Sequence, residues 1–387
     1  MKTLHVYRTY FPSSQGGLEE TIRQMCHASA AYGTESRVIA PAPAPSPKVV
    51  KVDNAWVYQP KKSFEIASCT FSLEMFQTFA QQAEWADVIH YHFPWPFADL
   101  LHLWTNPRKP SVLTYHSDIV RQKGLSLMYR PLMNRFLDQV DRIVCTSPNY
   151  FATSEALANF ESKTTVIPFG IDPKTYPEPS DKVIDEVRKQ YGENFFLFVG
   201  VLRYYKGLHI LIDALEGRPY RAVIAGSGPI EAELRARAKA RNLENVDFAG
   251  YVSNEVKSAL FKLCKAIVFP SYLRAEAFGV TLLEGAMFGK PLISTEVGSG
   301  TSHVNIHNET GLVVAPGSPK ALRKAMDEMY AKEQRTKNMG KLARERFQRH
   351  FSSLLMGQRY NALYQSVCGH NISKPKEFDF ASNSHRS

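Results

Sequence analysis

Short apolar runs and longer amphipathic stretches alternate along this chain of 387 residues. In the first half, runs rich in β-branched and apolar residues predict strands at 4–8, 36–40, 87–92, 111–116, 142–146 and 164–168. Segments such as 18–32 and 125–140 have the apolar spacing of amphipathic helices. Strands that alternate with helices are typical of a parallel sheet covered by helices. We therefore expect a doubly wound domain in this half.

The same alternation restarts after a proline-rich break between residues 168 and 180. Strands are predicted at 195–199, 221–225, 246–249, 265–269 and 291–295. Helices are predicted at 206–216, 230–241, 254–263, 279–288, 319–330, 335–349 and 353–367. The fold class is therefore α/β, with two doubly wound Rossmann-like domains facing a cleft. The expected limits are 1–172 for the first domain, 173–193 for a linker region, 194–367 for a second domain that includes the terminal helices, and 368–387 for a polar tail.

Composition narrows the class of protein. With 44% hydrophobic and 22% charged residues, the chain has ordinary globular averages, which excludes a disordered or coiled-coil protein. No apolar run approaches the roughly 18 residues of a membrane span, so we expect a cytoplasmic protein that is soluble or attached to the membrane surface. The five cysteines are scattered and odd in number, which favours neither a disulfide framework nor a zinc site.

The net charge of +10 is concentrated in the second half of the chain. Residues 1–175 hold 17 basic and 15 acidic side chains, a net of +2, which leaves +8 for residues 176–387. Nucleic acid, an anionic lipid surface and a nucleotide diphosphate all fit this asymmetry, as does a merely solvated face. Nucleic acid is disfavoured, because the basic residues are not interleaved with aromatic residues in a recognisable module.

Two Rossmann-like domains suit a nucleotide, since such sheets bind ligands beyond the carboxyl ends of their strands. A nicotinamide enzyme would carry G-x-G-x-x-G directly after a strand. The nearest match contains Gly226 and Gly228 but has Glu231 at the position of the third glycine. A carboxylate at that position would repel a pyrophosphate, so the sequence argues against a dehydrogenase.

The most specific pattern lies between residues 269 and 291, after a predicted buried strand. A loop carries Glu276, a helix is expected to begin near Phe278 and Gly279 without a strong side-chain cap, and Glu284 follows inside that helix. The free N–H groups at such a helix start would be available to an anion. Solvated helix residues are the alternative explanation for two glutamates at this spacing.

These residues resemble the E-x7-E motif of retaining glycosyltransferases of family 4, which have the two-domain GT-B fold. The resemblance runs through nearly the whole chain, from Gly16-Gly17 to Gly289-Lys-Pro291. It implies that Glu276 lies beside the transferred sugar and that Glu284 hydrogen-bonds the donor ribose. It also implies that the backbone of Phe278, Gly279 and Val280 meets the sugar and the phosphate.

A second set of residues follows the strand predicted at 195–199. Arg203 and Lys206 can place two positive charges on a diphosphate, and neutralising that leaving group lowers the barrier. Lys206, beside Gly207, matches the family resemblance cleanly, and with Arg203 it is assigned to catalysis. Val201 stands where relatives commonly have arginine, so Arg203 is expected to supply that charge from two residues further on. Surface cations are the alternative.

The first domain offers a glycine loop and two histidines. Gly16 and Gly17 follow the first strand and allow close backbone approach to donor or acceptor, although a plain turn would also use them. Strand ends are expected to deliver His92 and His116 to the cleft. His116 resembles the family histidine that lies against the sugar. Asp118 is expected to orient His116 or to contact the acceptor. A metal site built from these histidines is the rival interpretation, but no carboxylate-rich ligand set accompanies them.

Further donor-binding residues are expected in the second domain, namely Gly226 and Gly228 together with Tyr251, Val252 and Lys257. Tyr251 and Val252 follow a strand and resemble the loop whose backbone contacts the nucleobase. Lys257 matches a lysine that some guanine-using relatives place at the base, and a helix-surface lysine is the alternative.

Together, these observations predict a retaining sugar transfer from a nucleotide sugar. The string from Leu202 to Leu208 resembles bacterial polysaccharide mannosyltransferases of the O-antigen type, which favours GDP-mannose as donor. The resemblance implies a front-face path in which a donor phosphate oxygen helps to take the acceptor proton. No metal and no cofactor are expected, since no Asp-x-Asp occurs. A UDP-sugar donor and a non-catalytic nucleotide or sugar sensor are the alternatives.

The expected acceptor is a lipid-linked glycan at the inner membrane face. The stretch 121–135 carries Arg121, Lys123, Arg130 and Arg135 around an apolar series. Such a basic amphipathic helix can lie at anionic lipid headgroups. A helix that packs against the core with its charges exposed is the alternative.

Overall fold

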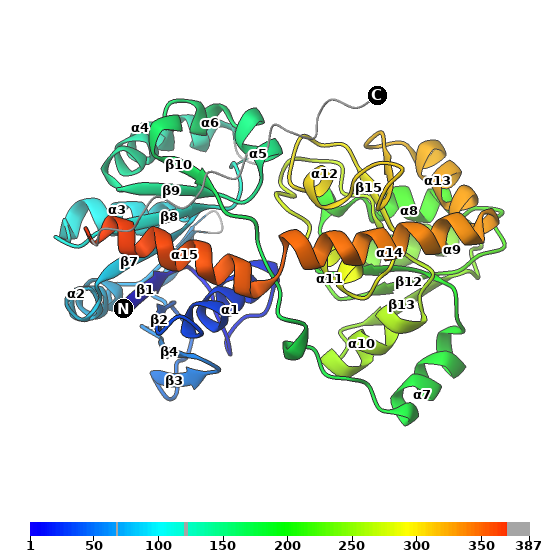
Figure 1. Ribbon diagram of the computed structural model, residues 1–387, viewed down its shortest axis with the longest axis horizontal. Coiled ribbons are helices and arrows are strands. Elements are labelled where there is room, and N and C mark those ends of the chain that lie inside the picture. The colour runs from blue at the N-terminus through cyan, green and yellow to red at the C-terminus, as the bar shows by residue number, and fades with distance from the viewer. Residues whose placement is uncertain (67–68, 120–122, 370–387) are drawn as a thin grey trace.

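The protein folds into two α/β domains that lie side by side (Figure 1). The computed structural model describes residues 1–66, 69–119 and 123–369. Each domain is built on one mostly parallel sheet with helices on both faces, as the alternation of apolar runs and amphipathic stretches predicts.

The N-terminal domain has an eight-stranded sheet in the order β10-β9-β8-β7-β1-β2-β4-β3. All neighbouring pairs are parallel except β3 and β4, which run antiparallel. The strands are β1 (Lys2–Val6), β2 (Glu35–Ile39), β3 (Val49–Val52), β4 (Ala55–Tyr58), β7 (Val88–Phe93), β8 (Ser111–Tyr115), β9 (Arg142–Cys145) and β10 (Thr164–Val166). A separate hairpin pairs β5 (Phe64–Ile66) with β6 (Cys69–Phe71).

Helices connect the parallel strands of this domain. They are α1 (Gly17–Ala30), α2 (Glu74–Trp85), α3 (Pro96–Thr105), α4 (Lys123–Gln139), α5 (Pro148–Thr153) and α6 (Glu155–Ala158), with the 3-10 turn η1 at Glu161–Lys163. The central strands β7 and β8 are buried along their whole length. A strand buried on both faces needs cover on both sides, which the crossover helices supply.

The C-terminal domain has a six-stranded, fully parallel sheet in the order β13-β12-β11-β14-β15-β16. Its strands are β11 (Phe196–Val199), β12 (Ala222–Ala225), β13 (Val246–Gly250), β14 (Ala266–Phe269), β15 (Leu292–Thr295) and β16 (Gly311–Val314). Its helices are α7 (Asp181–Tyr191), α8 (Leu208–Ala214), α9 (Glu231–Ala240), α10 (Asn254–Leu263), α11 (Val280–Met287), α12 (Thr301–Val304), α13 (Pro319–Ala331) and α14 (Glu333–His350). Two 3-10 turns, η2 (Pro173–Thr175) and η3 (Tyr204–Lys206), lie in the linker and after β11.

The last helix, α15 (Ser353–Val367), corrects the expected domain limits. The sequence pattern assigned it to the second domain, but it crosses back and covers the N-terminal sheet (Figure 1). The hydroxyl of Tyr364 lies 2.7 Å from Nδ1 of His90, and that of Tyr360 lies 3.0 Å from Oγ1 of Thr114. Gly357 lets α15 approach α1 closely, because a Cβ there would lie 2.6 Å from the carbonyl oxygen of Ala28. Helix α15 therefore completes the first domain.

Most strands lie within two residues of their predicted positions, and four of the five described strands that were not predicted lie at sheet edges, while β4 lies between β2 and β3. The missed strands are β3, β4, β5, β6 and β16, which have three or four residues each. Short edge strands have half-exposed patterns that resemble loops. The expectation for the polar tail falls largely on residues 370–387, which lie outside the described residues.

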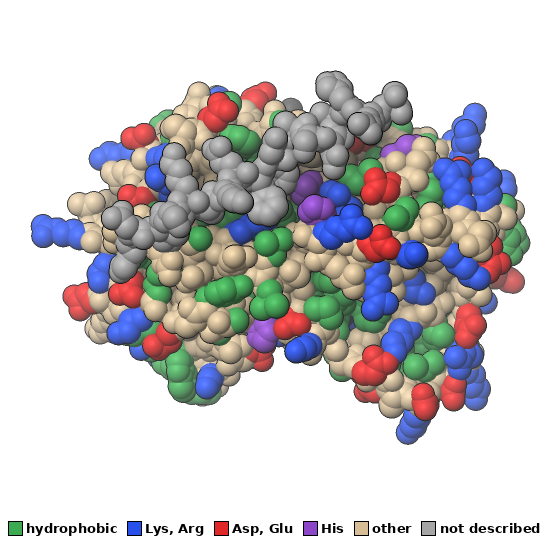
Figure 2. Space-filling view, viewed as in Figure 1, with side chains coloured by type: hydrophobic (Ala, Val, Ile, Leu, Met, Phe, Trp, Pro, Cys, Tyr) green, Lys and Arg blue, Asp and Glu red, His purple; other side chains and the backbone are tan. Residues whose placement is uncertain are grey.

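Surface charge follows the asymmetry of the sequence. On the face shown in Figure 2, Lys and Arg side chains are denser over the C-terminal domain than over the coloured part of the N-terminal domain. All five cysteines are free. Among the described residues, no helix combines the length and apolar character that a membrane span requires.

Candidate active site

Loops that follow parallel strands of the two sheets meet between the domains, and we call this interdomain region the cleft. Side chains from both domains touch across it: Nη2 of Arg274 lies 3.1 Å from Oδ2 of Asp118, and the hydroxyl of Tyr251 donates to Oε1 of Gln15 at 2.8 Å. A Cβ on Gly17, at the start of α1, would lie 3.9 Å from Cγ2 of Val280. The glycine loop of the first domain therefore faces the start of α11.

Lys206 and Glu276 form a partly buried ion pair in this cleft. Lys206 ends the turn η3 after β11, Glu276 lies in the loop after β14, and Nζ of Lys206 donates to Oε2 of Glu276. Their side chains are 14% and 10% exposed. The two strands are neighbours in the sheet, so residues 70 positions apart meet at one edge. The structure thus brings together the two residues that the sequence assigns to the sugar and the diphosphate.

Lys206 is held in its charged form. Burial by itself would lower its pKa, but the carboxylate of Glu276 and the nearby Tyr205 outweigh burial and raise the pKa above its usual value. Nζ also lies 4.6 Å from the centre of the Phe269 ring, where the face of the aromatic ring attracts a cation. A fixed ammonium group at this place is suited to an anionic leaving group.

Helix α11 begins at the point where the E-x7-E pattern predicts it, with one difference. Its N-cap, Gly279, has φ +85°, a conformation that favours glycine, and no side chain caps the helix. The N–H group of Gly279 is nevertheless not free, because it donates to Oε1 of Glu276 at 3.1 Å. Glu276 therefore connects Lys206 to the helix start. The expectation of N–H groups that are available to an anion therefore does not extend to Gly279.

Glu284 is anchored by two side chains from elsewhere in the cleft. Its Oε1 accepts hydrogen bonds from Nζ of Lys257 at 2.9 Å and from the hydroxyl of Tyr176 at 2.8 Å. Lys257 also lies 4.7 Å from the centre of the Tyr176 ring. Lys257 is therefore part of the Glu284 cluster, and the alternative of a plain helix-surface lysine is wrong. Tyr176 was missed, because a tyrosine within a proline-rich linker carries no signal in the sequence.

Arg203 lies beside the cleft and is exposed. Its charge reaches the N-terminal domain: burial raises the pKa of Tyr7, while the cations of Arg8 and Arg203 act in the opposite direction. Arg203 is thus available to a ligand, whereas Lys206 is already paired. Its part in catalysis stays a prediction.

Gly226 and Gly228 have a packing role that explains why they are glycines. A Cβ on Gly226 would lie 2.0 Å from the carbonyl oxygen of Gly200, and one on Gly228 would lie 2.4 Å from that of Leu202. These contacts stack the loop after β12 on the loop after β11, which carries Lys206. Contact of the two glycines with the donor stays a prediction, as does nucleobase contact by exposed Tyr251 and partly buried Val252.

Two further predicted site residues of the N-terminal domain, Gly16 and Asp118, lie in loops at the cleft. Gly16 is the N-cap of α1 and lies close to Glu19, which accepts a hydrogen bond from Ser14 at 2.7 Å. Asp118 accepts hydrogen bonds from the hydroxyls of Tyr115 and Ser154, both at 3.0 Å, as well as pairing with Arg274. The expectation that Asp118 orients His116 is therefore wrong. Arg274 was missed because its partner lies 156 residues away in the other domain.

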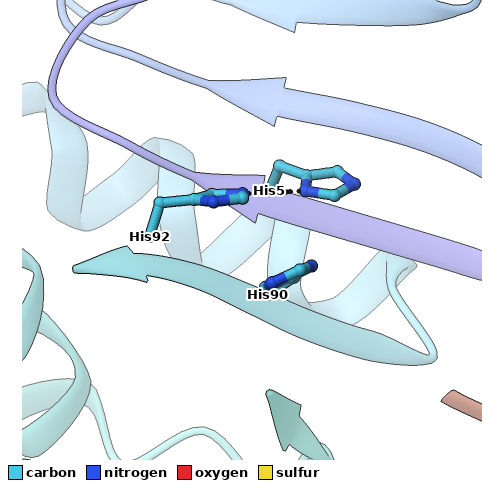
Figure 3. Close-up of side chains that lie close together, drawn as sticks. All are labelled: His5, His90 and His92. Carbon is cyan, nitrogen blue, oxygen red and sulfur yellow. Dashed lines mark hydrogen bonds between the residues drawn. The ribbon is translucent and has the colours of Figure 1, made fainter. Parts of the chain in front are cut away.

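His116 follows β8 and is hydrogen-bonded to another histidine. Its Nε2 lies 3.0 Å from Nδ1 of His92, and Nε2 of His92 lies 3.0 Å from Nδ1 of His5. Figure 3 shows His5 and His92 joined in this way, with His90 beside them. All four histidines are buried.

The geometry of His5, His90 and His92 bears on the rival metal interpretation. One nitrogen from each lies within 4.8 Å of the others. The rings of His90 and His92 are stacked at 4.5 Å with 23° between their planes, and those of His5 and His92 are stacked with 20° between them. The planes of His5 and His90 are tilted by 38°. Lone pairs lie in the ring planes, so the two stacked pairs direct theirs alongside one another rather than at one ion about 2 Å away. Within the described part of the chain no carboxylate belongs to this group, so a buried divalent cation would also lack a compensating charge.

Comparison with known proteins identifies the class to which this fold and site belong. Residues 15–175 match the family model described as Glycosyltransferase Family 4, and residues 180–346 match the one described as Glycosyl transferases group 1. A solved structure of sucrose-phosphate synthase from Thermosynechococcus elongatus superimposes with a TM-score of 0.79 at 22% identity, covering 96% of this chain and 100% of that one.

Two relatives are similar over almost their full lengths. D-rhamnosyltransferase WbpZ of Pseudomonas aeruginosa is 50% identical over 353 residues, which cover 91% of this chain and 93% of the relative. O-antigen chain mannosyltransferase C of Escherichia coli is 46% identical over 367 residues, covering 95% and 99%. The chain belongs to glycosyltransferase family 4, and its two domains form the GT-B fold.

Proposed function

We propose that this glycosyltransferase transfers mannose from GDP-mannose, with retention at the anomeric carbon, to a lipid-linked glycan in the synthesis of O-antigen-type polysaccharide. The observation that carries the proposal is the near full-length similarity to O-antigen chain mannosyltransferase C. The string from Leu202 to Leu208 also favours mannose, because it resembles bacterial polysaccharide mannosyltransferases.

The arrangement of charges supports transfer without a covalent glycosyl-enzyme. Glu276 is bound to Lys206 and Gly279, and Glu284 is bound to Lys257 and Tyr176. Neither carboxylate is placed as one half of a glycosidase-type nucleophile and acid pair. Lys206 would stabilise the departing diphosphate, with Arg203 adding a second charge, and a donor phosphate oxygen would take the acceptor proton.

Transfer of D-rhamnose is the second candidate, favoured by the 50% identity to D-rhamnosyltransferase WbpZ. D-rhamnose is the 6-deoxy form of D-mannose, so the two sugars differ by a single hydroxyl. A UDP-sugar donor and a non-catalytic sensor remain outcomes of the test. A sensor would turn over no donor and would not need the pair of Lys206 and Glu276.

The test is a donor panel assayed for transfer to polyprenyl-diphosphate-linked glycan. GDP-mannose, GDP-D-rhamnose and a set of UDP-sugars are compared by kcat/KM, with Glu276→Gln as the inactive reference and Lys337→Ala as the control. Lys337 pairs with Glu333 on an exposed helix face at 2.7 Å. Highest kcat/KM with GDP-mannose supports the proposal. Preference for GDP-D-rhamnose or a UDP-sugar, or no transfer from any donor, overturns it.

We further propose that the enzyme works attached to the cytoplasmic face of an anionic membrane. An apolar patch on the N-terminal domain supports this. Aromatic rings follow one another from Phe64 through Phe71, Phe97 and Phe76 to Trp104, with centre-to-centre distances of 4.9 to 6.4 Å. Ile66, Leu73, Trp104 and Met128 are 62%, 73%, 75% and 81% exposed.

Helix α4, which packs against α3, carries the exposed cations of Arg130 and Arg135. The expected contribution of Arg121 lies outside the described residues, as does the side chain of Lys123. Apolar side chains beside cations favour the boundary of anionic headgroups and acyl chains. The attraction is screened by salt, so attachment should weaken as ionic strength rises.

Vesicle sedimentation tests the attachment. We expect binding to phosphatidylglycerol vesicles, weaker binding at high salt, and little binding to phosphatidylcholine. Trp104→Ser should reduce binding severalfold, whereas Trp56→Ser, at an exposed tryptophan on β4, should not. Equal, negligible binding to both lipids at low salt, or equal effects of the two substitutions, would show that this patch is not a membrane anchor.

A further inference from the structure

Three histidines form a continuous hydrogen-bonded chain from the interior of the N-terminal sheet to the cleft. His5 lies on β1, His92 on β7, and His116 directly after β8, and these strands are neighbours. Each link is 3.0 Å long, from Nδ1 of His5 to Nε2 of His92 and from Nδ1 of His92 to Nε2 of His116. His116 at the cleft end is the residue that the family resemblance places against the sugar.

The imidazoles are neutral, so each has one N–H group and one lone pair. Burial lowers the pKa of His5 and of His116 to about 3, and it lowers that of His92 well below the usual value. In a chain of neutral imidazoles, the direction of one hydrogen bond fixes the direction of the next. The three tautomers are therefore coupled.

The neighbouring His90 does not interrupt this chain. Its Nδ1 lies 2.7 Å from the Tyr364 hydroxyl, and its Nε2 lies 2.7 Å from Oγ1 of Thr114. Both nitrogens are therefore engaged elsewhere. The ring stacks on that of His92 and closes the space above it.

The His5 end of the histidine chain decides the direction in which its hydrogen bonds run. Nε2 of His5 is buried and has no hydrogen-bond partner among the described residues. If the bonds pointed from His116 toward His5, this atom would carry an N–H group without an acceptor. Buried N–H groups without partners are rarer than acceptors without partners. The bonds therefore run outward: Nδ1–H of His5 donates to His92, and Nδ1–H of His92 donates to Nε2 of His116.

We propose that His5 and His92 are positioning residues that hold His116 as its Nδ1–H tautomer, so that His116 offers a hydrogen-bond donor to an oxygen of the bound sugar. This role rests on the proposed function, because it needs a substrate at His116. Nδ1 of His116 is the nitrogen suited to the task, since its Nε2 is occupied by His92. With the opposite tautomer, the same atom would present a lone pair, which can only accept a hydrogen bond from a sugar hydroxyl and cannot donate one to an oxygen.

The tautomers can be determined by NMR on the full-length protein without any nucleotide-sugar donor. Long-range ¹H–¹⁵N correlations of ¹⁵N-histidine distinguish Nδ1–H from Nε2–H, and His5→Leu, His92→Leu and His116→Leu spectra assign the signals. We expect Nδ1–H for His5, His92 and His116. An Nε2–H form of His116 overturns the inference and leaves the donor assignment untouched, so failure of this proposal is distinguishable from failure of the proposed function.

Kinetics tests whether the chain matters for turnover. His5→Leu removes the first donor, whereas His5→Asn keeps an N–H group near the place of Nδ1. We expect His5→Leu to shift His116 toward Nε2–H and to lower kcat about tenfold, the worth of one hydrogen bond, with little change in donor KM. His5→Asn should recover most of both losses.

The matched control is His102→Leu. His102 is a buried histidine of the same domain that bonds the Tyr91 hydroxyl at 2.9 Å and has no part in the chain. It should keep the wild-type tautomer of His116 and the wild-type kcat. An equal loss of kcat in His102→Leu and His5→Leu would show a merely structural role and would contradict the proposal. A wild-type kcat in a His5→Leu protein whose His116 has changed tautomer would also contradict it.

Discussion

The two sheets of this enzyme share a doubly wound plan but differ in what they bury. In the C-terminal sheet, β11, β12 and β14 consist entirely of apolar residues. In the N-terminal sheet, the central strands bury Thr3, His5, His90, His92 and Thr114. The helix α15 closes over that polar interior and contributes two tyrosine hydroxyls to it.

The difference indicates how each domain carries its chemistry. In the C-terminal domain, charged residues lie in loops and helix starts beyond an apolar sheet, where Lys206, Glu276 and Glu284 are paired. In the N-terminal domain, the polar chain runs inside the sheet and reaches the cleft at His116. Substitutions at the C-terminal edge should therefore act on charge stabilisation and donor binding. Changes in the N-terminal sheet should act on the stability of that domain and on the state of His116.

The largest effect is expected at the ion pair of the C-terminal edge. Glu276→Gln and Lys206→Ala should each lower turnover with saturating donor about 100-fold, or about 2.7 kcal/mol, because the leaving diphosphate and the sugar lose their fixed charges. Circular dichroism and thermal melting check that the variants are folded. Near-wild-type turnover in either folded variant would discard the assignment of this pair.

A smaller effect, on stability, is expected when the pH is lowered. This loss of stability should be larger for the N-terminal sheet than for the C-terminal sheet. Because the native pKa of His5 and His116 is about 3, these groups take up protons near pH 6.5 only when the chain unfolds. Their contribution is therefore present above pH 6.5 and lost as the pH falls toward 3. For each of these two histidines, lowering the pH from 7.5 to 5.5 should reduce the free energy of unfolding by about 1.4 kcal/mol.

Hydrogen exchange measured by peptide can separate the two sheets. After correction for intrinsic exchange rates, peptides of β1 and β7 should lose more protection at pH 5.5 than peptides of β11 and β14. The C-terminal domain should also lose some, because burial lowers the pKa of His303 to about 3. An equal loss in both sheets would contradict the difference between them.

Glu284 and its partners should affect the donor more than the chemistry. Glu284→Gln and Lys257→Ala should raise the donor KM about fivefold with a smaller change in kcat, because they loosen the cluster that the family resemblance places at the ribose. Steady-state kinetics with varied donor is the measurement. A fall in kcat as large as that of Glu276→Gln would place Glu284 at the reacting centre.

The smallest effect is expected from chelation. Lys206, Arg203 and the start of α11 would supply the positive charge that a divalent ion supplies in other glycosyltransferases, so excess EDTA should leave the rate nearly unchanged. Addition of manganese to the dialysed enzyme is the companion assay. A rate that EDTA abolishes and manganese restores would mean that this charge is not sufficient.

The central strands of both domains could be predicted from the sequence because a strand buried on both faces is rich in apolar residues. In β11, β12 and β14 the apolar run is continuous, whereas in β7 and β8 polar residues interrupt it. The domain of α15 could not be predicted in that way. Its tyrosines resemble ordinary core residues. Only the three-dimensional structure shows that they cover His90 and Thr114 of the N-terminal sheet rather than the C-terminal sheet, which is nearer in the sequence.

The candidate site was predictable in its residues but not in its pairings. Family resemblance pointed to Lys206, Glu276 and Glu284, yet nothing in a linear pattern indicates that Tyr176 would anchor Glu284. His90 and His92 alternate along one strand, which places them on one face. Their relation to His5 depends on strand order, since β1 is the neighbour of β7 although more than 80 residues separate them.

The account depends most on sugar transfer from GDP-mannose at the cleft with retention, and the configuration of the product tests this directly. The one-bond ¹³C–¹H coupling at the new linkage is measured by NMR after reaction of GDP-α-mannose with the lipid-linked acceptor. The account predicts an α-mannosyl product, formed with release of GDP and formed about 100-fold more slowly by Glu276→Gln. A β-mannosyl product, or an α-mannosyl product formed equally well by Glu276→Gln, would contradict it.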